Sequence, residues 1–94
     1  MSIAKSDIVK SVAGRDAGSL FFVLATEGDF LLLADGKTRR VEAPKRKKRK
    51  HVQFVSAEES RLSAKIQGEE KITNSELRRA LAVFRGEDYP SQEG

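Results

Sequence analysis

Short apolar runs separated by turn signals fill the first half of the chain. The runs "LFFVLAT" (20–26) and "FLLLA" (30–34) are continuously apolar, and the "EGD" between them is typical of a tight turn. Weaker alternation of apolar and polar residues over 7–12 and over 51–55 predicts one strand before this pair and one after it. The segment 37–43 is more polar, and we expect it to be an exposed strand that follows an Asp-Gly turn signal. Five short strands are therefore predicted within the first 55 residues.

The predicted strands are too few and too short to form two packed sheets. Strands of this length can instead curl into a small, partly open barrel, which limits the number of exposed edges. A barrel buries only one face of each strand, but 20–25 and 30–34 are apolar on both faces. Another part of the chain is therefore expected to cover the outer face.

The second half of the chain carries helical patterns. Residues 61–67 form a weak helical stretch, and a stronger one begins where Thr73 and Glu76 have the spacing of a capping box. Gly86 ends this second helix, and 87–94 is expected to be a frayed tail. The apolar residues of the second helix recur on one helical face: Leu77, Ala80, Leu81 and Phe84. Because so short a helix is marginal on its own, this face is expected to pack on the outer face of the barrel.

These patterns predict a mainly β fold, a small five-stranded barrel with a C-terminal α-helical segment. Residues 1–55 are expected to form the barrel with its basic loop, and residues 56–94 a connector followed by the helices that pack on the barrel. The chain has 94 residues, of which 38% are apolar and 34% charged, and this fits one small globular domain. No apolar run reaches the roughly 18 residues that a membrane helix needs, and residues 1–10 lack the apolar core of a secretory signal. The absence of cysteine fits a reducing compartment, so a cytoplasmic location with no membrane partner is expected.

Positive charge is concentrated in one stretch of the chain. Residues 37–50 hold nine of the 18 Lys and Arg residues and a single acid, Glu42, whereas the other residues carry nine bases and 13 acids. The net charge of +4 thus hides a mildly acidic body with one strongly basic segment, and this asymmetry favours a polyanionic partner. Within the segment, "KRKKRK" (45–50) follows Pro44, which lacks an amide donor and disfavours helix before it. We expect 45–50 to be an extended, exposed loop rather than a paired strand.

The sequence offers no constellation for catalysis or metal binding. His51 is the single histidine and there is no cysteine, which leaves neither a nucleophilic pair nor a zinc ligand set. The glycines of "GRDAG" (14–18) lack the Lys-Ser or Lys-Thr pair of a phosphate-binding loop. We therefore expect no catalytic residue, no metal and no small-molecule cofactor, and the protein is not expected to be an enzyme.

The stretch "DIVKSVAGRDAGSLFFVL" (7–24) resembles a KOW motif, in which a strand, a glycine-containing loop with a basic residue and an apolar strand follow one another. Extended through "ATEGDFLLLADGKTRRVEAPKRKKRKHVQF" (25–54), the chain resembles the short bacterial KOW-domain RNA-binding proteins. Those proteins are similar to the large-subunit ribosomal protein fourteen-e family of archaea and eukaryotes. The resemblance implies an SH3-like barrel that binds structured RNA, with ribosomal RNA of the large subunit as the expected partner. A resident ribosomal component and a factor that visits the ribosome both fit.

The expected RNA contacts are cations of the glycine loop and of the basic segment. The resemblance implies that Arg15 contacts the RNA backbone, that 37–40 begins the basic face and that 45–50 makes the main phosphate contacts. Such contacts read charge rather than sequence. The chain has no Trp and its single Tyr, Tyr89, lies in the tail, so we expect shape-and-charge recognition of folded RNA rather than base stacking. The expected RNA-binding residues are Lys10, Arg15, Lys37, Arg39, Arg40, Lys45, Arg46, Lys47, Lys48, Arg49 and Lys50.

Three other interpretations stay open. A charge run on a loop can simply be solvated, and "PKRKKRK" (44–50) also matches a nuclear import signal. The main alternative is a protein-interaction module that uses the barrel and the apolar face of the second helix. Protein partners therefore stay open beside RNA.

Overall fold

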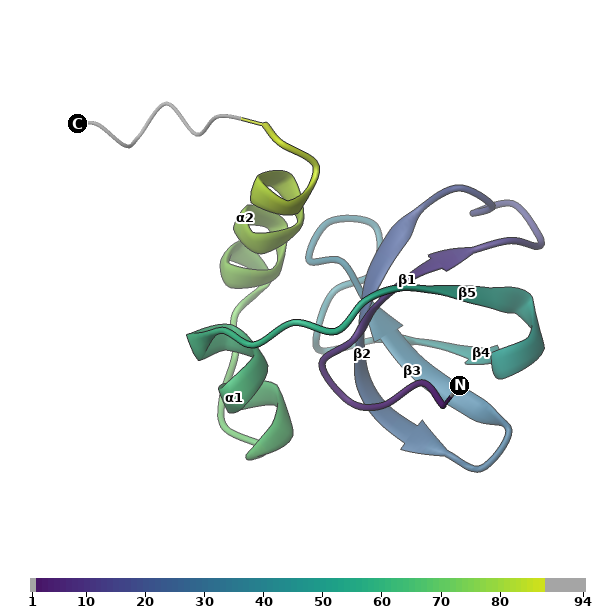
Figure 1. The fold of residues 1–94 in the computed structure, drawn as a ribbon, viewed down its shortest axis with the longest axis horizontal. Helices are drawn as coiled ribbons and strands as arrows, with labels where there is room; N and C mark the ends of the chain where they lie inside the picture. Colours follow the sequence, from purple (N-terminus) through teal and green to yellow (C-terminus); the bar gives the residue numbers. More distant parts are fainter. Residues whose placement is uncertain (1, 88–94) are drawn as a thin grey trace.

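The computed structural model describes residues 2–87, so the tail predicted for 88–94 lies outside the described part of the chain. The fold is one antiparallel five-stranded sheet with two helices beside it (Figure 1). Its elements, in chain order, are β1 (Ile8–Ser11), β2 (Leu20–Glu27), β3 (Phe30–Ala34), β4 (Lys45–Lys48), the short 3-10 helix η1 (Arg49–His51), β5 (Val52–Ser56), α1 (Arg61–Gln67) and α2 (Asn74–Phe84).

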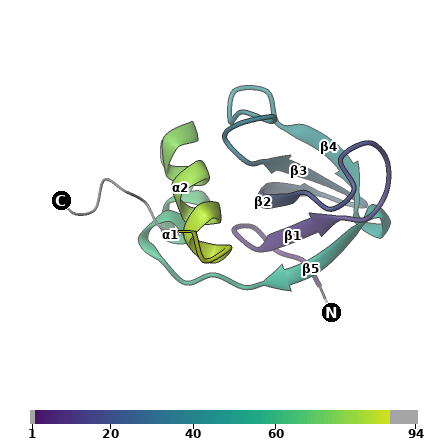
Figure 2. The ribbon, with the colours of Figure 1, turned by 90° about the horizontal axis from the view of Figure 1, so that it is seen from above.

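The strands follow the order β4-β3-β2-β1-β5 across the sheet. Strands β4 and β5 are therefore the two edges, and η1 connects them along the chain. Their edges are not hydrogen-bonded to each other, so the strand pairing does not close into the predicted barrel. Seen from above, the strands lie to one side and both helices to the other (Figure 2).

The predicted fourth strand was wrong. Residues 37–43 form turns, and the fourth strand is Lys45–Lys48, within the run expected to be an exposed loop. It pairs antiparallel with β3, and Lys47 lies opposite Leu31. The local argument from Pro44 failed because β3 offers an unpaired row of backbone groups on that side, which β4 satisfies. Pro44 itself lies just before the strand, where its missing amide costs no ladder hydrogen bond.

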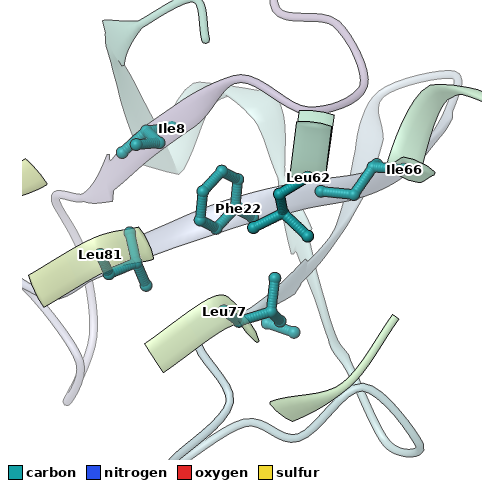
Figure 3. Close-up of a cluster of buried hydrophobic side chains, with 7 residues drawn as sticks. Ile8, Phe22, Leu62, Ile66, Leu77 and Leu81 are labelled. Carbon is teal, nitrogen blue, oxygen red and sulfur yellow. The ribbon is translucent and has the colours of Figure 1, made fainter. Parts of the chain in front are cut away.

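Two hydrophobic clusters lie on opposite faces of the sheet. Strand alternation sends successive side chains to opposite faces, so neighbours such as Phe21 and Phe22 belong to different clusters. The first cluster, on the face away from the helices, is built from Val9, Phe21, Val23, Leu31 and Leu33. The second lies between the sheet and the helices (Figure 3) and is built from Ile8, Phe22, Ala34, Leu62, Ile66, Leu77 and Leu81. The helices therefore cover the second apolar face, which is what the doubly apolar strands predict.

Both helices begin where the sequence predicts. At α2, Thr73 accepts a hydrogen bond from the Glu76 amide and the Glu76 side chain accepts one from the Thr73 amide, which completes the capping box. Ser60 and Ser63 make the equivalent exchange at α1. The predicted apolar face of α2 is buried at Leu77 and Leu81, but Phe84 keeps 38% of its surface exposed.

Candidate nucleic-acid interface

The cations of β4 alternate between the two faces of the sheet. Lys45 and Lys47 lie opposite Leu33 and Leu31, two members of the first cluster, and share their face. Arg46 and Lys48 lie on the other face, opposite Leu32 and Phe30. The pleat therefore divides the basic run between the two faces of the sheet.

Asp16 lies in the loop between β1 and β2 and forms ion pairs with both Lys45 and Lys47. Lys47 Nζ lies 3.0 Å from Asp16 Oδ1 and donates a further hydrogen bond of 2.9 Å to the carbonyl of Ala13. Lys45 Nζ lies 3.0 Å from Asp16 Oδ2, in ion-pair contact. Ser11 Oγ donates to Asp16 Oδ1 at 2.8 Å. Only 8% of Lys47 is exposed, so this lysine is an internal anchor of the glycine loop and not a free surface charge.

These contacts decide the ionisation of Asp16. Burial opposes the charged carboxylate, but the Ser11 hydroxyl and the ammonium groups of Lys45 and Lys47 outweigh it. Together they hold the pKa of the Asp16 carboxyl well below its ordinary value. One carboxylate thus faces two lysines, and the group keeps a net positive charge.

Arg46 and Arg49 are also held by the protein itself. The Arg46 guanidinium lies 3.7 Å from the centre of the Phe30 ring, and its Nε lies 3.2 Å from Glu27 Oε1. Arg49 Nε donates a 2.6 Å hydrogen bond to the carbonyl of Gly28, and its Nη1 donates one of 3.0 Å to the carbonyl of Ile3. Arg49 therefore ties the β2–β3 turn and the N-terminal segment to η1.

The remaining predicted residues divide into one paired and six unpaired cations. Arg40 Nε lies 3.1 Å from Glu42 Oε2. The side chains of the other six make no polar contact with any residue of the range 2–87. We call them the free cations: Lys10, Arg15, Lys37, Arg39, Lys48 and Lys50.

Four of the six free cations gather in two places. Arg15 and Arg39 line a depression of about 450 Å³ together with Lys45, at the end of β4 where the glycine loop meets the β3–β4 loop. Lys48 and Lys50 line another depression, of about 500 Å³, at the opposite end of β4. The basic residues therefore lie at both ends of one edge strand.

The β3–β4 loop, residues 35–44, has a fixed conformation. Asp35 accepts hydrogen bonds from the Lys37 and Arg39 amides, at 2.9 and 2.8 Å, and from the Thr38 hydroxyl at 2.7 Å. Burial works against ionisation of Asp35, but these donors outweigh it and lower the pKa of the carboxyl. This Asp-centred turn takes the place of the strand predicted at 37–43.

Helix α2 anchors the same loop. The Val41 amide donates to Asn74 Oδ1 at 2.8 Å, and Asn74 Nδ2 donates to Glu42 Oε1 at 2.7 Å. Arg78 Nη1 donates to the carbonyl of Gly36 at 2.7 Å. The loop that carries Lys37 and Arg39 is thus bound to the start of the second helix.

Residues of both helices line an apolar groove. It has a volume of about 490 Å³, and Leu62, Ala80, Val83 and Phe84 are among its lining residues. Val83 is 62% exposed, more than any other large apolar residue of the described chain. Phe22 of β2 and residues of the connector before α1 complete its lining, and no residue of the basic run takes part.

Sequence reasoning missed three residues of this region. Asp16 lies in the quoted glycine loop, but nothing local shows that lysines from β4 will reach it. Arg78 and Arg85 lie off the apolar face of α2, and the structure brings both to a depression beside Lys37. Their only sequence signal was their position away from the apolar face.

Residues 2–87 contain no group of three or more His, Cys, Asp or Glu side chains placed to hold a metal ion. Over the same range, no helix has both the length and the apolar character needed to cross a membrane. Comparison of the chain with protein-family models and with curated proteins finds no match.

Proposed function

We propose that this protein binds RNA without catalysing a reaction, through phosphate contacts made by the free cations, four of which lie at the two ends of β4. The observation that carries the proposal is that some of the basic residues are bound by the protein itself, whereas others have no internal partner. Lys47 and Arg49 are held by hydrogen bonds to the protein's own backbone, whereas Arg15, Lys37 and Arg39 have no partner among residues 2–87. Exposed cations near one another repel, and a phosphate backbone relieves that repulsion while releasing its counterions.

The backbone that carries these cations is already ordered. Asp16 holds the strand end and the glycine loop, and Asp35 with Asn74 holds the β3–β4 loop. Binding then costs mainly side-chain freedom, not loop ordering, which favours affinity. Arginine forks also match the geometry of phosphate oxygens, and two of the free cations are arginines at one depression.

We further infer that the curved sheet is a variant of the SH3-like barrel and that the protein is a KOW-type RNA-binding protein. The strand order, with η1 between the two edge strands, and the glycine loop between β1 and β2 support this inference. Large-subunit ribosomal RNA is the partner that this resemblance favours. A cytoplasmic location accompanies that proposal.

Fluorescence anisotropy with a labelled RNA duplex of about two helical turns tests the proposal. If six cations each neutralise one phosphate, the logarithm of the binding constant should fall against that of salt with a slope of about −5. The paired change Arg15→Gln with Arg39→Gln should weaken binding and reduce the slope by about 2. The same holds for Lys48→Gln with Lys50→Gln.

The matched control is Arg61→Gln with Lys71→Gln, which removes the same charge from exposed positions outside the two depressions. Its salt slope should stay within about 0.5 of the unaltered protein, because distant surface charges are screened. Equal slopes for the control and both test pairs would contradict the proposal.

A second candidate function, binding of a protein partner, is favoured by one observation: the groove between α1 and α2 leaves Val83 and Phe84 exposed. Apolar residues there would accept an apolar side chain of the partner. Replacing Val83 and Phe84 with Ser separates the two functions. If that variant no longer sediments with ribosomal subunits in a sucrose gradient while its affinity for the RNA duplex is unchanged, binding of a protein partner explains the association better.

A further inference from the structure

We propose that helix α2 is part of the RNA-binding surface, with Arg85 and Arg78 contacting the phosphate backbone beside Lys37. This inference rests on the proposed function and extends it to an element that otherwise covers the hydrophobic core. It assigns a third phosphate-binding depression, made jointly by the helix and two loops of the sheet.

The third depression has a volume of about 400 Å³ and is lined by three separate segments. Gly18 to Leu20 come from the glycine loop and the start of β2, Asp35 and Lys37 come from the β3–β4 loop, and α2 with the residues just after it forms the remaining wall. Its floor includes Leu81 and Ala82, which are buried. Cations on the rim of such a concavity lie beside low-dielectric walls, which strengthens their attraction for an anion.

The third depression adjoins the one lined by Arg15 and Arg39, since Ser19 lines both. Lys10 borders it as well, because Lys10 lies directly opposite Leu20 in the β1–β2 pairing and shares its face. Cations from β1, the glycine loop, the β3–β4 loop and α2 therefore adjoin along one side of the molecule. A phosphodiester chain that enters the first depression has charged contacts available in the next.

The acids of the third depression, Asp35 and Glu87, leave these cations available. Asp35 accepts three hydrogen bonds from its own loop, from the Lys37 and Arg39 amides and the Thr38 hydroxyl. Arg85 Nε lies 2.9 Å from Glu87 Oε2, and both side chains are about half exposed. Arg78 uses one nitrogen, Nη1, on the carbonyl of Gly36. A guanidinium has five N–H donors, so both arginines keep donors that a phosphate can take.

Helix α2 also positions the loop that shares the depression. Asn74 bonds to Val41 and Glu42, and Arg78 bonds to Gly36, on the same helix that ends beside Arg85. The spacing between Lys37 and the helix arginines is thus set by direct hydrogen bonds and not by a mobile linker. Because the cations are held in place before binding, a phosphodiester chain pays a smaller ordering cost and gains by counterion release.

The test is the salt dependence of RNA binding by the full chain with Arg85→Gln, measured with the same labelled duplex. Loss of one phosphate contact should reduce the salt slope by about 1. It should also weaken binding equally for duplexes of different sequence, because phosphate contacts do not read bases. The change Arg85→Lys should keep most of the slope. Lys71→Gln is the matched control, and thermal unfolding followed by circular dichroism should show that all three variants are folded.

Each outcome of this experiment has one meaning. A reduced slope for Arg85→Gln with an unchanged slope for Lys71→Gln supports the assignment. If Arg15→Gln with Arg39→Gln weakens binding but Arg85→Gln behaves as the control does, the role of α2 is overturned and the proposed function stands. If none of the variants changes RNA binding, or if poly-glutamate binds and the duplex does not, the proposed function and this inference both fail.

Discussion

Lys47 Nζ lies 3.0 Å from Asp16 Oδ1, so a lysine at the centre of the most basic run of the chain is neutralised inside the fold. The pair joins the edge strand β4 to the glycine loop between β1 and β2, two segments about 30 residues apart in the sequence. Lys47 also donates to the carbonyl of Ala13, which leaves this part of the loop bound from two sides. The basic run is therefore partly a structural element, and only some of its charges are available to a partner.

The first prediction concerns the different roles of neighbouring lysines. Replacing Lys47 with Glu should lower the free energy of unfolding by about 3 kcal/mol or more, since it places a second carboxylate beside Asp16 at the buried position of Lys47. Lys48→Glu makes the same change of charge at an exposed position with no partner in the described chain. It should change stability by no more than about 0.5 kcal/mol. Urea unfolding of both variants checks this, and equal destabilisation would contradict the structural role of Lys47.

The second prediction concerns acid stability. Because the pKa of Asp16 is lower in the folded than in the unfolded chain, its stabilising contribution is complete above the unfolded pKa of about 4. The contribution declines as the pH falls below that value. Asp16→Asn should therefore be less stable than the unaltered protein by about 1–3 kcal/mol near pH 7, and the difference should shrink below about pH 4.

Urea unfolding at a series of pH values measures this difference, with Asp29→Asn as the control. Asp29 is exposed, and its side chain has no partner among residues 2–87. Because the pKa of Asp35 is also lowered, the unaltered protein and Asp16→Asn will both lose stability in acid. The informative quantity is therefore the difference between their free energies of unfolding at each pH. A gap that stays constant from pH 7 to pH 2 would refute the role of Asp16.

The third prediction concerns the contact between the β3–β4 loop and α2. Gly36 has a φ of +79°, and a Cβ added there would overlap the backbone carbonyl oxygen of Asn74. Gly36→Ala should therefore destabilise the protein through both backbone strain and displacement of the loop from α2. Gly28 has a φ of +60° with open space around its Cβ position, so Gly28→Ala carries the strain alone.

The strain alone should cost about 1–2 kcal/mol, and Gly36→Ala should cost at least about 1 kcal/mol more than Gly28→Ala. Thermal unfolding of the two variants gives the comparison. Should Gly28→Ala prove equal or worse, the close approach of loop and helix would not contribute to stability.

The fourth prediction concerns the helices as a cover for the sheet. Leu77 is fully buried against the sheet, and Leu77→Ala should lower the free energy of unfolding by about 2–5 kcal/mol. Val83 lies on the exposed side of the same helix, so Val83→Ala should lower the free energy of unfolding by less than about 0.5 kcal/mol. Chemical unfolding distinguishes them, and similar small losses would mean that the helix packs only loosely.

Local sequence signals located most of the secondary structure. The apolar runs gave β2 and β3 nearly to the residue, and the Thr73–Glu76 spacing gave the start of α2, because these patterns depend on near neighbours in the chain. The apolar character of both faces of β2 and β3 also predicted that another element covers the sheet. The fourth strand was missed because its pairing depends on β3, which lies more than ten residues earlier in the sequence.

What the sequence by itself determined is the content of this protein: short strands, two capped helices and one concentrated block of positive charge. What only the tertiary structure decided is which of those charges are free. The pleat of β4 turns Lys45 and Lys47 toward Asp16, and the register with β3 fixes which residues those are. A shift of the register by one residue would turn Arg46 and Lys48 inward instead, and the composition of the run would be the same. Partners set by strand pairing are invisible to local pattern because the distance between them is fixed in space and not along the chain.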